Sequence, residues 1–227
     1  MSCSSTTSIN QALIKVVTVM ANIYLLRHGE TEWNQSGNRY CGRTDIPLSS
    51  AGKRQAERAA LFLKHVSFSG AYSSTLKRAY DTACIIAERH HLPVKQEERI
   101  IEADFGRWEG KKKSVFIREN PEAWKKWAAE PETYRAGEIG ETAADIFRRA
   151  KNFYEQLATE FQNGQNILVV SHNTVNRIFL AGILGMPFKN YRYIAQSNTG
   201  INVIRLDEAN PPLIRQINVC EHLAGNQ

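Results

Sequence analysis

Short apolar runs separated by longer amphipathic segments form the main pattern along this chain. The two strongest runs are residues 23–26 (Ile-Tyr-Leu-Leu) and residues 166–170 (Asn-Ile-Leu-Val-Val), and each ends abruptly. Short runs of this kind are typical of strands that are buried on both faces of a parallel sheet. A shorter run at residues 71–73 and two late runs near 201–206 and 213–219 predict further strands.

Amphipathic segments between these runs predict helices. Ser49 or Ser50 is the expected cap of the first long helix, and Thr75 is the expected cap of the second. A third, long helix should follow Thr142, and a fourth should cover residues 174–184. Strands that alternate with helices in this order predict an α/β fold. We expect a three-layer sandwich with a mostly parallel central sheet and helices on both faces.

The predicted elements fit one domain over residues 20–227. Residues 1–19 are expected to be an N-terminal extension, because Met20 resembles a natural start followed by the first strand. Residues 94–101 read as an extended segment, and two shorter helices punctuated by prolines should follow. Residues 107–140 are therefore the expected cap, where substrate specificity would be decided.

Polar residues with catalytic chemistry follow the predicted strands. Arg27 and His28 come directly after the first strand, and His172 comes after the strand at residues 166–170. Arg78 opens the helix after residues 71–73, and Glu102 follows the extended segment. Ligands of open α/β sheets bind beyond the carboxyl ends of the strands, so these side chains are expected to converge there.

Two arginines, two histidines and a carboxylate suit phosphoryl transfer. Arginine binds a phosphate bidentately through a planar fork that stays charged. A neutral imidazole with one bare nitrogen can attack phosphorus. A carboxylic acid can protonate the leaving alkoxide and then, as a carboxylate, activate water.

The overall composition agrees with a small anionic partner. With 29 basic and 23 acidic residues the formal charge is 29 − 23 = +6, and apolar residues make up 42% of the chain. The basic residues are dispersed, so we expect a small phosphorylated metabolite rather than nucleic acid as the partner. The one short basic run, at residues 111–113, is either a solvated face or a lip that steers anions.

Other features limit the class of protein. The four cysteines, Cys3, Cys41, Cys84 and Cys220, are widely and irregularly spaced, which favours a reducing, cytoplasmic location. No apolar stretch is long enough for a membrane span, and no histidine has the spacing of a metal ligand. We therefore expect no membrane partner, no metal and no cofactor, in a monomer or homodimer.

The segment Arg27-His28-Gly29-Glu30-Thr31-Glu32-Trp33-Asn34 resembles the signature of the histidine phosphatase superfamily, the phosphoglycerate mutase-like proteins. The likeness covers roughly residues 21–206 and implies the family's α/β fold. Further segments resemble, in order, the family's substrate loop, second-arginine motif, acid motif and last two motifs: residues 40–52, 73–79, 102–110, 140–142 and 170–172.

The resemblance implies roles for the matching residues. His28 would be the phosphorylated nucleophile, with Arg27, Arg78 and His172 binding the phosphoryl group. Glu102 would be the proton donor and later the base; Asp104, two residues on, is the rival acid.

Four more residues are implied as substrate contacts. Asn34 would donate to the phosphoryl group, and Cys41 and Gly42 would line the entrance. Asn173 is a departure, since many members have glycine after the second histidine. Its backbone N–H could still reach a phosphate oxygen, and the His-Asn form favours hydrolysis weakly.

Three functions fit the pattern. The first is a metal-independent phosphatase, similar to α-ribazole phosphatases, broad-specificity phosphatases and phosphoserine phosphatases. The second is a 2,3-bisphosphoglycerate-dependent phosphoglycerate mutase, but Ala103-Asp104-Phe105 replaces the basic pair and tyrosine of that branch. The third, a non-catalytic phospho-ligand binder, would need a lost nucleophile or acid.

Trp124 and Trp127, at helical spacing, are either cap packing or an apolar wall for the substrate.

Overall fold

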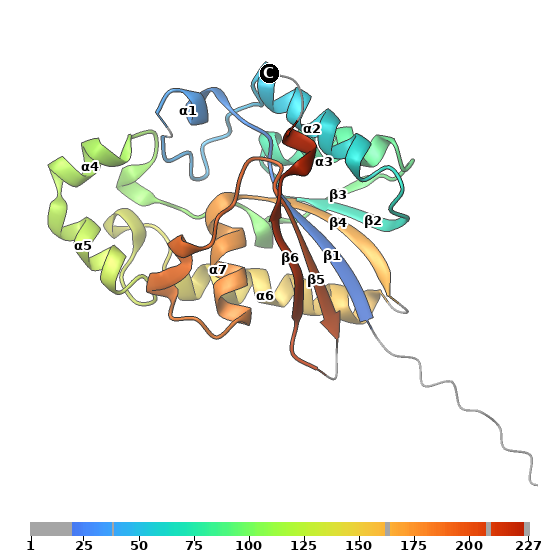
Figure 1. Ribbon diagram of the computed structural model, residues 1–227. Coiled ribbons are helices and arrows are strands. Elements are labelled where there is room, and N and C mark those ends of the chain that lie inside the picture. Colours follow the sequence, from blue (N-terminus) through green and yellow to red (C-terminus); the bar gives the residue numbers. More distant parts are fainter. Residues whose placement is uncertain (1–19, 38, 162–163, 208–209, 225–227) are drawn as a thin grey trace, which may run out of the picture.

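The computed structural model describes residues 20–37, 39–161, 164–207 and 210–224 (Figure 1). The predicted extension at residues 1–19 lies outside this part. The strands are β1 (Met20–Arg27), β2 (Phe68–Ser73), β3 (Val94–Gln96), β4 (Gln165–Ser171), β5 (Ile201–Asp207) and β6 (Leu213–Val219). The helices are α1 (Glu32–Gln35), α2 (Ser50–Phe62), α3 (Lys77–Glu88), α4 (Lys113–Glu119), α5 (Pro121–Ala129), α6 (Ala143–Glu160) and α7 (Asn173–Ile183). Short 3-10 helices cover Glu98–Ile100, Gly106–Trp108, Ala136–Glu138, Phe188–Tyr193 and Glu221–Leu223.

The strands form one mixed sheet in the order β3-β2-β4-β1-β5-β6. The first four in this order run parallel, whereas β5 runs antiparallel to both of its neighbours, β1 and β6. The chain reaches β5 from the carboxyl end of β1, where the Thr199 N–H donates to the Arg27 carbonyl oxygen at 3.0 Å. A strand that begins beside the end of β1 must run in the opposite direction. The expected α/β fold with a mostly parallel sheet is thus confirmed, with this antiparallel edge added.

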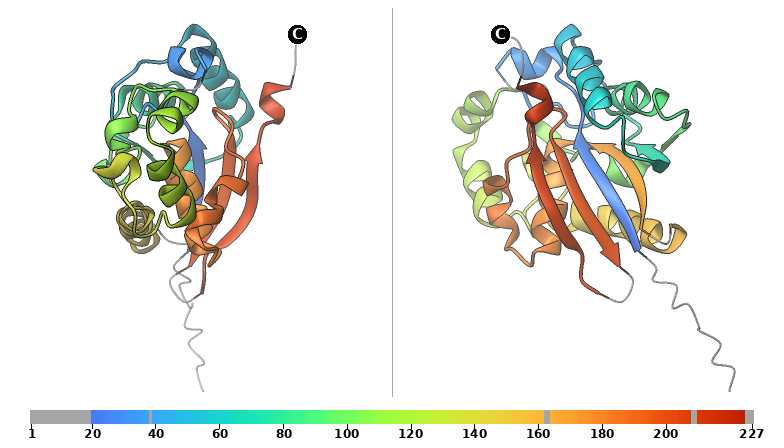
Figure 2. Two further views of the ribbon diagram at one scale, coloured as in Figure 1. Left: turned by 90° about the vertical axis from the view of Figure 1, so that its left-hand side faces the viewer. Right: turned by 45° about the vertical axis from the view of Figure 1, so that its right-hand side comes forward.

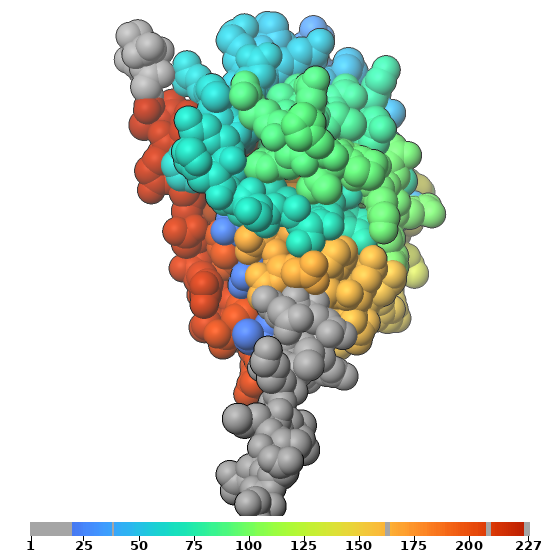
Figure 3. Space-filling model, turned by 90° about the vertical axis from the view of Figure 1, so that its right-hand side faces the viewer, coloured from blue at the N-terminus to red at the C-terminus, as the bar shows by residue number. Residues whose placement is uncertain are grey.

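Successive residues of the central strands pack on opposite faces of the sheet. Ile23 and Leu25 of β1 belong to a core formed with α6 and α7, whereas Leu26 belongs to a core formed with α2 and α3. Side chains alternate along a strand, so an uninterrupted apolar run marks a strand covered on both sides. Figure 2 shows the helices on the two faces, and on the side of the molecule seen in Figure 3 only a little of β1 (blue) is visible.

Several predicted element ends are observed, and one is wrong. Ser49 caps α2 by accepting from the Gly52 N–H at 3.1 Å, and Thr142 caps α6 in a reciprocal pair with Asp145. Thr75 does not cap α3. The N-cap is Leu76, which makes no side-chain cap bond, and its own N–H donates to Ser74 Oγ at 3.2 Å. The predicted extended segment 94–101 is a strand only over β3.

Helices α4 and α5 lie apart from the sheet, in the predicted cap (Figure 1). Their apolar side chains join the core on the α6 and α7 side, with Trp127 fully buried and Trp108 stacked on Phe116 at 4.8 Å between ring centroids. For Trp127 the structure therefore shows packing. None of the helices in the described residues is both long and apolar enough to cross a membrane.

Candidate active site

A cavity of about 400 Å³ lies at the carboxyl edge of the sheet and receives most of the predicted site residues. This size suits a small metabolite. A slightly larger cavity, about 480 Å³, lies beside α6, α7 and β5, but it holds none of them. The site cavity is lined by Arg27, His28, Asn34, Gly37, Arg39, Tyr40, Cys41, Arg78, Glu102, Phe105, Lys113, Asn173, Thr174, Arg177, Tyr191 and Arg192.

His28 stands at the end of β1 with a defined protonation state. Its backbone N–H donates to the Ser171 carbonyl oxygen at 3.0 Å, which ties it to the end of β4. Its Nδ1 lies 2.7 Å from the Gly29 carbonyl oxygen. A carbonyl oxygen only accepts, so Nδ1 carries the proton and Nε2 is bare. Burial, followed by the charges of Arg78 and Arg27, holds the pKa of His28 well below its usual value, so the ring is neutral at pH 7.

The two arginines are held by backbone carbonyl oxygens. Arg78, in the first turn of α3, donates through Nη1 to Thr44 at 2.9 Å and through Nη2 to Gly42 at 2.8 Å. Arg27 donates through Nη1 to the Gln196 carbonyl oxygen at 2.8 Å. Burial lowers the pKa of Arg27 to about 10, which still leaves it charged at pH 7. Neither forms an ion pair with another described residue, so both keep their charge available for an anion.

Glu102 is the one carboxylate among the described residues that line the cavity. Its Oε1 accepts from the Ala103 N–H at 2.8 Å, and its Oε2 accepts from the Thr174 N–H at 3.3 Å, in the first turn of α7. Burial raises its pKa above the ordinary value despite these donors and the charge of Arg78. Asp104 does not line the cavity and accepts instead from the Gly106 N–H at 2.8 Å. The geometry thus favours Glu102 as the acid.

His172 lies beside His28 but outside the cavity lining. The ring centroids are 5.2 Å apart, and His172 is fully buried at the end of β4. Its Nε2 lies 2.7 Å from Ser74 Oγ, and its Nδ1 is buried without a hydrogen-bond partner among the described residues. Burial lowers the pKa of His172 well below its usual value, so this ring is also neutral at pH 7. Its direct contact with a phosphoryl group stays a prediction.

The predicted substrate contacts occupy different places. Asn34, Cys41 and Asn173 line the cavity. Gly42 does not. It adopts a φ of +51°, and a Cβ there would lie 2.0 Å from Glu109 Oε1, so glycine lets this loop pass close to Glu109. Its carbonyl oxygen holds Arg78, which gives Gly42 a positioning role.

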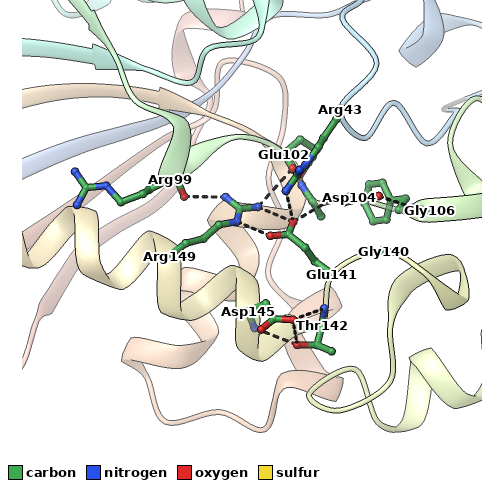
Figure 4. Close-up of polar contacts among 12 residues, drawn as sticks. Arg43, Arg99, Glu102, Asp104, Gly106, Gly140, Glu141, Thr142, Asp145 and Arg149 are labelled. Atoms are coloured by element: carbon green, nitrogen blue, oxygen red, sulfur yellow. Dashed lines mark hydrogen bonds and ion pairs between the residues drawn. The ribbon is translucent and has the colours of Figure 1, made fainter.

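A half-buried ion pair between Arg149 and Glu141 fixes the backbone on which Glu102 stands (Figure 4). Arg149 of α6 donates through Nε to Glu141 Oε1 at 2.8 Å and through Nη1 to the Arg99 carbonyl oxygen at 2.7 Å. Its Nη2 lies 3.4 Å from the Glu102 carbonyl oxygen. Glu141 Oε2 accepts from the Asp104 N–H at 3.0 Å. The loop is thus held on both sides of the acid.

Sequence reasoning missed several residues of this site. Arg177 follows Asn173 by one helical turn on α7, and that spacing was a usable signal. Tyr191 and Arg192 reach the cavity from the 3-10 helix Phe188–Tyr193, and no local pattern marks them. Of the basic run, Lys113 lines the cavity, whereas Lys111 pairs with Glu119 at 2.6 Å.

Fold and cavity together define an α/β protein with a neutral histidine, two fixed arginines and a carboxyl group of raised pKa at one edge of its sheet. Residues 23–219 match the profile described as histidine phosphatase superfamily (branch 1). The chain therefore belongs to the histidine phosphatase superfamily, and the resemblance in its motifs is confirmed.

Individual relatives point to hydrolysis of phosphate esters. The chain is 35% identical to phosphoserine phosphatase 1 of Hydrogenobacter thermophilus, over 90% of this chain and 95% of that protein. It is 34% identical to the adenosylcobalamin/α-ribazole phosphatase of Escherichia coli, over 73% of this chain and 80% of that protein.

A solved structure gives the same indication. A mutant phosphoserine phosphatase from Entamoeba histolytica, in complex with phosphoserine, matches with a TM-score of 0.81 at 30% identity, over 89% of this chain and 99% of that one. The family and these relatives support phosphatase activity without fixing the substrate.

Proposed function

We propose that the chain is a phosphomonoester hydrolase that acts on a small phosphorylated metabolite through a phosphohistidine at His28, without a metal ion. The observation that carries this proposal is the presence, in one cavity, of a histidine with a bare ring nitrogen and a carboxyl group whose pKa is raised. His28 has a bare Nε2 and a lowered pKa, and Glu102 has a raised pKa. A nucleophile that is free of protons and an acid that holds one are what the first chemical step requires.

In the first step the phosphoryl group lies between the guanidinium groups of Arg27 and Arg78. His28 Nε2 attacks phosphorus in line as the bond from phosphorus to the ester oxygen breaks. Glu102 gives its proton to the leaving oxygen, and the alcohol departs. The arginine cations stabilise the charge that spreads over the equatorial oxygens in the transition state.

In the second step a water molecule attacks the phosphorus of the phosphohistidine. Glu102, now a carboxylate, takes a proton from that water, and the bond from phosphorus to Nε2 breaks. Inorganic phosphate leaves, His28 is again neutral, and Glu102 is again protonated. His172 and Asn34 are proposed to donate to the phosphoryl oxygens, and the Asn173 backbone N–H lies at the start of α7, where a helix favours an anion.

A direct test replaces the nucleophile. His28→Ala should abolish phosphate release from every phosphomonoester tried, because it removes the nitrogen that is proposed to accept the phosphoryl group. Released phosphate is measured with the unaltered protein as the reference. Retained turnover in His28→Ala would reject the mechanism.

A mutase remains the second candidate because the cavity holds more cations than one phosphate needs. Six lysine and arginine side chains line its described part. A mutase would return the phosphoryl group from His28 to another hydroxyl of the substrate. Incubation with 3-phosphoglycerate separates the two: a hydrolase yields phosphate and glycerate, whereas a mutase yields 2-phosphoglycerate.

A further inference from the structure

The cavity carries more positive charge than the proposed reaction uses. Its described lining includes six cations and a single carboxylate, Glu102. A phosphomonoester carries a charge of about −1.5 to −2 near pH 7, which Arg27 and Arg78 already match. The excess cations are Arg39, Lys113, Arg177 and Arg192, and none of them forms an ion pair with a described residue.

Two of these cations have buried donors with nothing to bind. Arg177 Nε and Arg192 Nη2 are both buried, and each lacks a hydrogen-bond partner among the described residues. A buried, unpaired guanidinium donor is costly and is rarely left so in a folded protein. An acceptor supplied by a ligand would satisfy both groups.

Aromatic rings hold the outer cations in place. The Arg192 guanidinium lies 4.4 Å from the ring centroid of Tyr191 and 4.8 Å from that of Trp124. Lys113 Nζ lies 4.3 Å from the same Trp124 ring. Trp124 packs against the core through Trp108 and Phe116, which confirms the packing interpretation, and it does not line the cavity. Its ring also supports two like charges at the cavity rim.

The outer cations also repel one another. Burial first, and then the charge of Arg192, lowers the pKa of Lys113. Burial lowers the pKa of Arg177; Tyr191 and Glu102 oppose this shift, and the charge of Arg192 adds to it. Like charges held together with no ion-pair partner among the described residues favour an anion that comes to lie among them.

We propose that Arg177, Arg192 and Lys113 form a second anion subsite, which binds a carboxylate or a second phosphate on the alcohol part of the substrate. This inference rests on the proposed hydrolase function of the same cavity. It narrows the substrate class to phosphomonoesters with a second anionic group. The three side chains of this subsite come from α4, α7 and the 3-10 helix Phe188–Tyr193.

The test measures binding, so that it does not depend on turnover. His28→Ala protein is titrated calorimetrically with 3-phosphoglycerate and with glycerol 3-phosphate, which differ by a carboxylate in place of a hydroxymethyl group. A second pair, fructose 1,6-bisphosphate and fructose 6-phosphate, tests a second phosphate. We expect the doubly anionic member of at least one pair to bind about tenfold tighter or more, since hydrogen bonds to charged groups have about this effect.

Variants then assign the effect to residues. Arg192→Gln and Arg177→Gln, each made on the His28→Ala background, should each reduce that affinity ratio about tenfold. Lys113→Gln should reduce it less, because its side chain is exposed to solvent. Lys125→Gln is the matched control, because it removes the same charge from the cap at a side chain that is 70% exposed and lies outside the cavity.

The outcomes are separable from those of the hydrolase proposal. Affinity ratios near one for both pairs would overturn the subsite proposal. An equal fall of the ratio in Lys125→Gln would also overturn it, because the effect would then come from the general positive charge of the protein. Either result leaves hydrolysis through His28 standing. Conversely, absence of phosphate release from the unaltered protein would reject the hydrolase proposal without changing the binding result.

Discussion

At the scale of single residues, burial shifts the pKa values of His28 and Glu102 in the directions that the proposed reaction requires. In water, an imidazole loses its proton at a higher pH than a carboxylic acid does, so a neutral histidine beside a protonated glutamate is a minor state. In the cavity the pKa of His28 is lowered and that of Glu102 is raised, in both cases mainly by desolvation. Both shifts increase the fraction of molecules in which His28 is neutral while Glu102 is protonated.

Replacing the acid should make the rate depend on the leaving group. Glu102→Gln keeps the shape of the side chain but cannot donate a proton, so turnover of an alkyl phosphate should fall by about 10²–10⁴-fold. Turnover of p-nitrophenyl phosphate should fall far less, because p-nitrophenolate leaves without a proton. Steady-state kinetics on both substrates check this. Equal losses would point to Asp104 or another acid.

The same two groups set the dependence on pH. Glu102 must be protonated, so kcat/KM should fall as the pH rises through its raised pKa. His28 must be neutral, so kcat/KM should fall as the pH drops through its lowered pKa. In Glu102→Gln the decline toward high pH should disappear when p-nitrophenyl phosphate is used for both proteins, so that the ionisation of the substrate cancels. An unchanged decline would assign that limb to another group.

At the scale of elements, the site was largely predictable because it follows from strand order. The apolar runs of β1 and β4 identify buried parallel strands, and the residues after such strands meet at one edge. The structure bears this out with the 3.0 Å bond from the His28 N–H to the Ser171 carbonyl oxygen. The failed Thr75 cap shows the limit of local reasoning, because α3 begins one residue later, with Leu76 as an N-cap that makes no side-chain cap bond.

The ion pair behind the acid loop was not predictable, since Glu141 and Arg149 lie far from Glu102 in sequence. Glu141→Gln removes the carboxylate charge that faces the half-buried Arg149 guanidinium and should lower the free energy of unfolding by about 2 kcal/mol. Urea denaturation measures this loss. The loop that carries Glu102 would also be held less firmly. The alkaline limb of the pH profile of kcat, which reports the ionisation of Glu102, should therefore shift.

Thr142→Ala is the matched control for this variant. It removes the cap of α6 in the next position of the chain and should cost about 1 kcal/mol of stability. It should leave the pH profile in place, because Thr142 does not contact the acid loop. If both variants shift the profile alike, Glu141 acts only on stability.

At the scale of the whole molecule, the cavity joins segments that are far apart along the chain. Lys113 comes from the cap, Arg177 from α7 and Arg192 from the segment before β5. No local pattern connects them, so the sequence predicted the phosphoryl end of the cavity and offered Lys113, within the basic run, as a possible anion-steering residue, but it did not predict Arg177 or Arg192. The antiparallel edge of the sheet was missed for the same reason, because strand direction depends on where the connecting segment emerges.

Chelation tests the whole molecule for a required metal ion. In the described residues, no cluster of three histidine, cysteine or acidic side chains is suitably placed to hold one. Arginine cations are proposed to supply the charge that a metal supplies elsewhere, so dialysis against EDTA should leave kcat unchanged. Loss of activity that added Mg²⁺ or Zn²⁺ restores would contradict metal independence.

The central claim is a covalent phosphoryl bond to one nitrogen of His28, and trapping that bond tests it most directly. Unaltered protein and His28→Ala are mixed with a ³²P-labelled phosphomonoester, quenched in base during turnover, and digested for peptide mapping. We predict a base-stable, acid-labile label on the peptide that contains His28, and none on His28→Ala. A label on another residue, or turnover without any labelled protein, would contradict the account.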